Sequence, residues 1–251
     1  MIRFIDEKGL IEPVNAVGKV ADTVKAYGAT AAVTSFSNHL FQEILSRYGG
    51  KKIATVTGGI DNDIYGISID GKKLLAYQSP MGAPSAVMAA EEILCCGVES
   101  LVAFGICGAL TDVPQRTFVV PTKAYSDEGT SGHYVPPFDF IELKGAGKVA
   151  AALEKYGLKT ISGPNWCTDA LYRETRTRLE EMKSLGCISV DMECSALQAM
   201  CYYRKKNFYT FFITADSLAG EEWEPNYILD ISVAPLDSVG VSAAVRLASE
   251  L

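Results

Sequence analysis

Short apolar runs alternate with longer segments of helical periodicity along most of the chain. The pattern predicts strands at residues 29–34, 52–57, 65–69, 72–77, 100–104, 117–121, 158–162, 187–190 and 208–214. It predicts helices at residues 37–48, 83–96, 147–156, 174–185, 193–206 and 233–251. Strands and helices that alternate in this way are typical of a largely parallel sheet with helices on both faces.

The pair Asp70-Gly71 separates two predicted strands and is a hairpin signal, so we expect an antiparallel addition and a mixed sheet. No linker, repeat or low-complexity segment divides the chain, which predicts a single domain over residues 1–251. In sheets of this kind, ligands bind beyond the carboxyl ends of the strands. The residues directly after each strand are therefore the candidates for function.

Two acidic side chains follow predicted strands. Glu193 comes after the strand at 187–190, and Asp216 comes after the strand at 208–214. Taken singly, Glu193 fits the first turn of a helix and Asp216 fits a cap or Asx-turn. Together they stand at two strand ends of one sheet, where two acids can divide binding and proton transfer between them.

Two glycine-containing segments also follow strands. Residues 105–109 (GICGA) resemble a tight turn that lets a ligand approach the backbone, and residues 79–85 (SPMGAPS) precede a helix. Each alone is explained by an ordinary turn or by Ser85 as a helix N-cap.

Composition narrows the function classes. The net charge of −7 argues against a nucleic-acid surface, and Arg204-Lys205-Lys206 is explained by the end of a helix. With two histidines and no CxxC pair we expect no metal site. The seven cysteines lie mostly in apolar segments and predict buried thiols in the cytoplasm. No apolar run reaches membrane-spanning length, and the first residues lack a signal peptide's apolar centre.

Six motifs now carry a resemblance. They are PMGAPS (80–85), GICGAL (105–110), SDEGTSGHY (126–134), TDALYRET (168–175), VDMECSAL (190–197) and TADSLAG (214–220). In these motifs and in their order the chain resembles the nucleoside phosphorylases of the purine-nucleoside and uridine phosphorylase superfamily, whose relatives include methylthioadenosine nucleosidases. The resemblance implies a three-layer α/β/α domain and a homo-oligomer, either a dimer or a hexamer. It implies cleavage of a nucleoside's N-glycosidic bond by phosphate or water, with no cofactor beyond phosphate as a possible co-substrate.

The resemblance assigns three residues to the sugar. Glu193 is similar to the carboxylate that accepts hydrogen bonds from the ribose 2′- and 3′-hydroxyls, while Met192 and Met81 resemble residues that pack against the sugar. Positive charge develops on the sugar as the bond breaks. A carboxylate that orients the sugar therefore also favours the oxocarbenium-like state electrostatically.

The resemblance assigns five residues to the base. Asp216 is similar to the acid that protonates a purine leaving group. Cys107, Gly108 and Val190 resemble the wall of the base pocket, and Tyr172 falls in the segment that covers the base. Asp216 favours a purine. A pyrimidine nucleoside such as uridine remains an alternative substrate. However, no glutamine follows Tyr172, as one does in uridine phosphorylases.

The phosphate-binding residues of the family are missing here. The stretch 34–39 holds His39 in place of an arginine, the strand 101–104 has no arginine, Ile106 stands where a hydroxyl is usual, and residues 58–63 carry two acids. A dianion needs fixed positive donors. Arg3, Arg116 or Arg173 could supply charge from new directions, and the phosphate site is left unassigned. Two alternatives follow: a nucleoside hydrolase, with Asp61 or Asp63 as a possible base, or a non-catalytic nucleoside-binding protein.

Two further groups have simpler explanations. Asp127, Glu128 and His133 fit a polar loop after a strand better than a catalytic cluster. Trp223 and Tyr227 fit core or interface packing better than a lid.

Overall fold

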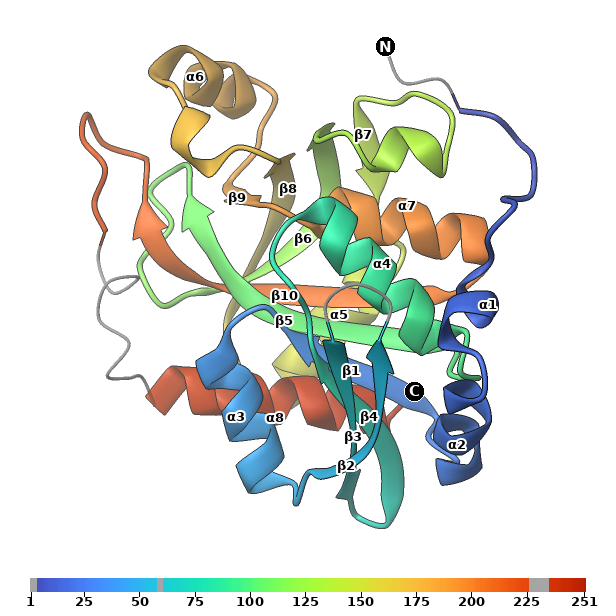
Figure 1. The fold of residues 1–251 in the computed structure, drawn as a ribbon. Helices are drawn as coiled ribbons and strands as arrows, with labels where there is room; N and C mark the ends of the chain where they lie inside the picture. The colour runs from blue at the N-terminus through green and yellow to red at the C-terminus, as the bar shows by residue number, and fades with distance from the viewer. Residues whose placement is uncertain (1–3, 58–60, 226–234) are drawn as a thin grey trace.

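The structure is a computed structural model that describes residues 4–57, 61–225 and 235–251 (Figure 1), without the side chains of residues 235–237. Arg3, Tyr227 and residues 58–60 lie outside the described residues, as do the first residues of the helix expected at 233–251.

Within the described residues, ten strands form one sheet. They are β1 (Ala31–Ser35), β2 (Lys51–Thr57), β3 (Asp61–Ile69), β4 (Lys72–Gln78), β5 (Ser100–Ala109), β6 (Phe118–Asp127), β7 (Phe140–Glu142), β8 (Thr160–Thr168), β9 (Ser189–Asp191) and β10 (Asn207–Ser217). Their order is β10-β6-β8-β9-β5-β1-β4-β3-β2, with β7 beside β6. The sheet is mixed, as expected. However, the described pairings include as many antiparallel as parallel pairs, so the prediction of a mostly parallel sheet was wrong.

The sheet closes on itself at one end. Strand β10 pairs with β6 and also lies parallel to β5 along most of its length. The strands β10, β6, β8, β9 and β5 therefore form a closed ring, and β1, β4, β3 and β2 extend from it. The alternation of strands and helices does not reveal this closure, because it depends on a pairing between segments about a hundred residues apart in sequence.

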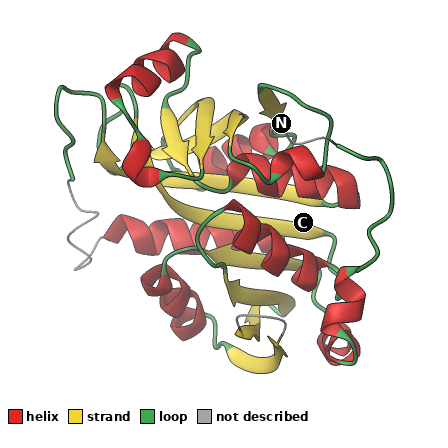
Figure 2. Cartoon of the chain, turned by 45° about the horizontal axis from the view of Figure 1, so that its top comes forward, coloured by secondary structure: helices red, strands yellow, loops and turns green. Residues whose placement is uncertain are grey.

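Helices pack on both faces of the sheet, as the alternation predicted (Figures 1 and 2). One face carries α1 (Pro13–Val17), α2 (Val20–Tyr27), α4 (Ala83–Leu94) and α7 (Cys194–Arg204), and the other carries α3 (Asn38–Arg47), α5 (Ala146–Lys155) and α8 (Pro235–Ser249). Successive residues of β5 point to opposite faces. Leu101 joins the first apolar cluster and Val102 joins the second.

Helix α6 (Arg176–Ser184) lies apart from both helix layers, near β8 and β9 (Figure 1). Its buried residues Leu179 and Met182 join a third, smaller cluster with Trp166, Val190 and Leu218. This cluster backs the strand ends where the sequence predicts a ligand.

The β3–β4 hairpin is confirmed. Asp70 and Gly71 both have positive φ, at 50° and 79°, which is what a tight hairpin turn between twisted strands requires. The strand predicted at 100–104 is too short, because β5 runs through the presumed turn to Ala109. The extension stays extended because both β9 and β10 pair with it. Helices α1 and α2 and strand β7 were not predicted.

The basic cluster at 204–206 ends α7, as expected. Lys205 adopts a left-handed conformation at the C-cap, and Arg204 pairs with Glu12 and Glu91 at 2.7 Å and 2.6 Å. The charge of Arg204 is therefore neutralised by ion pairs within the chain. Among the described residues, no helix combines the length and the apolar character that crossing a bilayer requires.

Gly240 offers a test of the packing between α8 and the sheet. A Cβ built there would lie 2.1 Å from the Phe104 ring, which stacks on Phe211 at 4.9 Å and cannot easily move away. We expect Gly240→Ala to lower the free energy of unfolding by about 1–3 kcal/mol in urea denaturation. The control is Gly147→Ala in α5, where no atom lies within 4 Å, and that change should be neutral or stabilising. Equal effects in the two variants would contradict this account.

Candidate active site

The candidate site is built around a glycine, Gly108. Gly108 of β5 is the cross-strand partner of Val190 in β9 and of Asp216 in β10. A Cβ at Gly108 would lie 2.9 Å from Val190 Cγ1 and 3.3 Å from Asp216 Oδ1. Glycine therefore lets the two strands close on β5 from both sides. The register of β10 shifts between Thr214 and Asp216, and such an irregularity re-aims the side chain that follows it.

Asp216 is buried, and its carboxylate is hydrogen-bonded to a tryptophan. Its Oδ2 accepts a hydrogen bond of 2.7 Å from Nε1–H of Trp223. Paired backbone hydrogen bonds between Ser217 and Glu224 hold the segment that carries the indole. Burial raises the pKa of Asp216, although the Trp223 hydrogen bond opposes the rise. Trp223 is half exposed and touches a candidate catalytic group, so packing alone, the explanation the sequence favoured, does not describe it.

Glu193 lies at the start of α7 and is 5% exposed. Its Oε1 accepts a hydrogen bond of 2.6 Å from the backbone N–H of Gly82, the residue at the N-cap of α4. Burial, and then the charge of Asp191, raise the pKa of Glu193. The carboxylate thus joins the 79–85 loop to the segment after β9.

Asp191 has a structural role beside it. Its Oδ2 accepts hydrogen bonds from the backbone N–H groups of Glu193 and Cys194, and its Oδ1 accepts one from Asn165 Nδ2 at 2.7 Å. Ser189 Oγ donates in turn to Asn165 Oδ1. This buried chain fixes the backbone from which the Glu193 side chain projects. Asp191 therefore holds the local backbone in place, and the side chain of Glu193 lines the site cavity described below.

One cavity, called the site cavity below, collects most of the predicted residues. It is lined by Phe36, Ser37, Met81, Ile106, Cys107, Gly108, Leu171, Glu174, Val190, Asp191, Met192, Glu193 and Asp216. All the residues assigned to sugar and base are present except Tyr172, whose side chain is 95% exposed. The turn η2 (Leu171–Arg173) presents Leu171 to the cavity in its place.

Sequence reasoning missed Glu174. It follows η2 and lines the site cavity, yet from the sequence it is only the first residue of the helix predicted at 174–185. Its carboxylate has no hydrogen bond or ion pair with any described residue. Burial, reinforced by the charge of Asp216, raises the pKa of Glu174 to about 7. Only the fold, which curls η2 back over the strand ends, brings this residue to the site.

The lining of the site cavity is acidic. Among the described residues it carries four carboxyl groups and no lysine, arginine or histidine. His39, Arg116 and Arg173, considered from the sequence as phosphate ligands, do not line it. Ser37, which caps α3 by accepting a hydrogen bond from the backbone N–H of Leu40, does line it. The N-terminal end of α3, where the helix dipole is positive, thus lies beside the site cavity.

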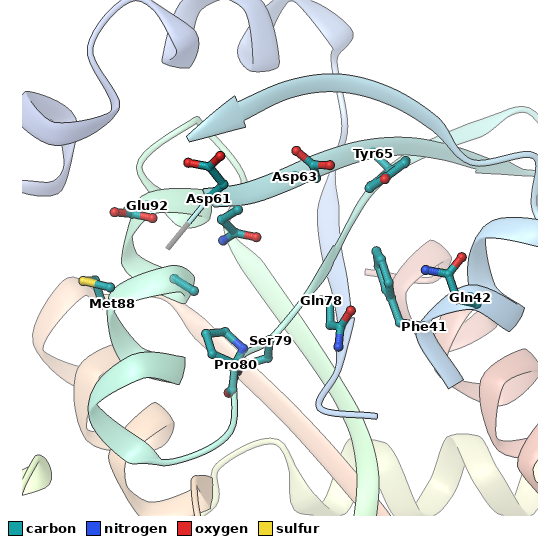
Figure 3. Close-up of a pocket in the computed structure, with 12 residues that line it drawn as sticks. Phe41, Gln42, Asp61, Asp63, Tyr65, Gln78, Ser79, Pro80, Met88 and Glu92 are labelled. Carbon is teal, nitrogen blue, oxygen red and sulfur yellow. Dashed lines mark hydrogen bonds between the residues drawn. The ribbon is translucent and has the colours of Figure 1, made fainter. Parts of the chain in front are cut away.

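Asp61 and Asp63 line a different cavity, shown in Figure 3. There β3 faces the residues after β4, between α3 and α4. Asp63 Oδ1 pairs with Lys52 Nζ at 2.7 Å and accepts a hydrogen bond from Thr55 Oγ1. The suggestion that one of these acids activates water at the glycosidic bond has no support in this placement.

The polar segment at 126–134 is held by its own hydrogen bonds. Glu128 accepts hydrogen bonds from the backbone N–H groups of Thr130 and Ser131 and from Ser195 Oγ of α7. Asp127 pairs with Arg178 at 2.7 Å. These contacts fit the polar loop that the sequence favoured. In the described part of the chain, no group of histidine, cysteine, aspartate and glutamate side chains is arranged to hold a metal ion.

A profile of the phosphorylase superfamily matches residues 16–235, most of the chain, and the chain belongs to that superfamily. The resemblance carried by the six motifs is thereby confirmed.

Individual relatives are more distant. A guanosine phosphorylase of Halorubrum lacusprofundi is 32% identical over 145 residues, which are 55% of this chain and 58% of the relative. A DeoD-type purine nucleoside phosphorylase of Brevibacillus brevis is 28% identical over 61% of this chain and 67% of the relative. A DeoD-type purine nucleoside phosphorylase of Exiguobacterium sibiricum is 24% identical over 82% of this chain and 87% of the relative. The chain thus matches little more than half the length of the first of these relatives.

The half-buried carboxyl of Glu174, which has no partner among the described residues, should make stability depend on pH. Its pKa is about 7 in the folded protein against an ordinary 4.5, so ionisation disfavours the folded state increasingly as pH rises between these values. Glu174→Gln cannot ionise. We expect it to be as stable as the wild type near pH 5 and more stable near pH 8, by on the order of 1–2 kcal/mol, in urea denaturation.

Glu180→Gln provides the control, because Glu180 is exposed and lies outside the site cavity. Its stability should follow that of the wild type at every pH. A gain for Glu174→Gln that is constant across pH would show that ionisation is not the cause.

Proposed function

We propose that this protein cleaves the N-glycosidic bond of purine nucleosides by phosphorolysis. The observation that carries the proposal is that Glu193, at the start of α7, and Asp216 of β10 line one cavity, beside Gly108 of β5 and its cross-strand partner Val190 of β9. The superfamily to which the chain belongs, and relatives named guanosine phosphorylase and purine nucleoside phosphorylase, support the same reaction class.

In this proposal Glu193 holds the sugar. Its carboxylate accepts hydrogen bonds from the 2′- and 3′-hydroxyls while Gly82 N–H fixes Oε1, so the group is already oriented before the nucleoside arrives. Met81 and Met192 pack against the ribose from the cavity wall. As the bond to the base breaks, positive charge grows on the sugar, and a fixed negative group in a poorly hydrated cavity stabilises it.

Asp216 serves the base. Its raised pKa increases the share of the protonated acid near neutral pH, and that acid can give its proton to the departing purine. Trp223 occupies Oδ2 through its indole N–H, which leaves Oδ1 for the base. Cys107, Gly108 and Val190 form an apolar wall beside it. A purine leaving group needs this proton, and the proposal therefore favours purines over uridine.

Hydrolysis is the second candidate. It is favoured by the absence of any basic side chain from the described lining of the site cavity, because a phosphate dianion needs positive donors and water does not. Phosphorolysis would require such donors from a neighbouring copy of the chain in the expected dimer or hexamer. The N-terminus of α3 at Ser37 gives partial support to an anion.

A nucleoside panel tests the reaction. We expect the purified protein to release free base from guanosine, inosine or adenosine in the presence of phosphate, with ribose 1-phosphate as the second product, measured by chromatography. Release of free ribose without phosphate would establish hydrolysis instead. Saturable nucleoside binding in calorimetry without turnover under either condition would leave a binding protein and refute both catalytic proposals.

Two conservative variants separate the roles of the acids. Glu193→Gln keeps an acceptor for Gly82 N–H but loses the charge, and should lower kcat/KM by at least about 10²-fold, partly through KM. Asp216→Asn keeps an acceptor for Trp223 but cannot donate a carboxyl proton, and should lower kcat by about 10²–10⁴-fold while binding persists. Steady-state kinetics and calorimetry distinguish the two patterns. Full activity in either variant would remove that residue from the mechanism.

A further inference from the structure

A second cavity, called the basic cavity below, lies between α5, the end of α7 and the start of β10. Its volume is about 430 Å³, which is the size of a small-ligand site. Its lining includes Lys144, Lys148, Gln198, Lys205, Lys206 and Tyr209. Asn207, the first residue of β10, also lines it, whereas Asp216 of the site cavity stands near the other end of that strand (Figure 1). A strand rises about 3.3 Å per residue, so the two cavities are roughly 25–30 Å apart.

The basic cavity has the opposite charge to the site cavity. Four lysines line it, and its described lining includes no aspartate or glutamate. Lys206 is paired with Glu99 at 2.6 Å. The other three, Lys144, Lys148 and Lys205, form no ion pair with any described residue. In a chain of net charge −7, this is a local concentration of positive charge, and a concave surface of that kind attracts an anion.

Two of these lysines stand where positive charge is unfavourable. The end of α7 accounts for the two lysines that follow it, but Lys144 and Lys148 flank the N-terminus of α5, where the helix dipole is itself positive. A Cβ at Gly145, the N-cap of α5, would lie 2.4 Å from the backbone oxygen of Phe208. Glycine therefore allows this helix end to lie against β10. Lysines and a helix N-terminus gathered at one cavity are compensated when an anion binds there.

A buried polar group on the wall of the basic cavity lacks a partner. Gln198 of α7 is 3% exposed and lines the cavity, and its Oε1 accepts no hydrogen bond from any described residue. A buried oxygen left in this way is unfavourable unless a ligand supplies a donor. A ligand that satisfies both features carries an anionic group for the lysines and a hydroxyl group for Gln198.

Tyrosine rings position the lysine side chains. Lys144 Nζ lies 4.2 Å from the centre of the Tyr202 ring, and Lys148 Nζ lies 5.6 Å from the centre of the Tyr209 ring. Both tyrosines line the cavity. Cation–π attraction holds the ammonium groups at the cavity wall without neutralising their charge, so they remain available to an anion.

We propose that the basic cavity binds a phosphate monoester of a hydroxylated sugar, at a site separate from the candidate active site. Lys144, Lys148 and Lys205 hold the phosphate together with the N-terminus of α5, and Gln198 Oε1 accepts a hydrogen bond from a sugar hydroxyl. A free sugar phosphate and a nucleoside monophosphate share this chemistry and differ in the base. The inference is independent of the proposed function.

Calorimetry at low salt tests the binding, with ribose 5-phosphate and adenosine 5′-monophosphate as probes. We expect saturable binding of at least one probe, weakening as salt rises. Inorganic phosphate should bind at least about 5-fold more weakly, because it brings no sugar hydroxyl to Gln198. Tighter binding of ribose 5-phosphate identifies a free sugar phosphate as the ligand class, and tighter binding of the nucleotide identifies a nucleoside monophosphate. Binding of neither probe, or equal binding of inorganic phosphate, overturns the inference.

Two variants test the assigned contacts. Lys148→Gln should weaken binding of the better probe by about 10-fold or more, because a charge-assisted hydrogen bond is lost. The matched control is Lys159→Gln, because Lys159 is exposed and lies outside the basic cavity and the site cavity. Gln198→Leu should weaken the probe by about 5-fold or more without weakening inorganic phosphate. Its urea midpoint should not fall, since the oxygen it removes has no partner among the described residues. Equal losses in Lys148→Gln and Lys159→Gln would contradict the assignment.

Glu193→Gln shows which cavity the probe occupies. Glu193 lines the site cavity, so its replacement should leave the affinity of the probe unchanged. A loss in Glu193→Gln with none in Lys148→Gln would place the probe in the site cavity and overturn the inference. The reverse pattern supports the inference even if the wild type cleaves no nucleoside. The inference and the proposed function can therefore fail separately.

Discussion

The structure depends on the junction where β9 and β10 meet β5 at Gly108. A side chain there would collide with Val190 and crowd Asp216, so the absence of a Cβ is what allows the ring of strands to close. The closure brings Gly108, Val190 and Asp216, each near the end of its strand, to one place. It also explains why residues 105–109, expected to form a tight turn, are instead part of strand β5.

Burial of negative charge is the second constraint. The site cavity gathers Glu174, Asp191, Glu193 and Asp216 without a basic side chain among its described lining residues. Three of these carboxyl groups accept hydrogen bonds from specific donors. Asp191 accepts from Asn165 and from backbone N–H groups. Glu193 accepts from Gly82 N–H, and Asp216 accepts from Trp223. Among the described residues none donates a hydrogen bond to the Glu174 carboxyl, so burial disfavours its ionisation without compensation.

Much of the fold and of the site followed from local pattern. The hairpin at Asp70-Gly71 and the two acids near strand ends are visible because turn chemistry and strand ends leave local signals. The extension of β5, the role of Trp223 and the position of Glu174 were not visible. Each depends on a contact between segments distant in the chain or on how a short turn folds back. The exposed position of Tyr172 has the same origin: neighbouring residues on η2 face different ways, and sequence similarity does not fix which of them faces inward.

The hydrogen bond from Gly82 to Glu193 joins residues 111 positions apart. Strand β5 pairs with β10, which is synthesised later still. Contacts of such long range form late, because chain closure must precede them. During synthesis the first half of the chain can therefore assemble β1, β3, β4 and α4 without any competent pocket. The site cavity is therefore a property of the finished fold, and a ligand that needs this cavity cannot stabilise an unfinished chain.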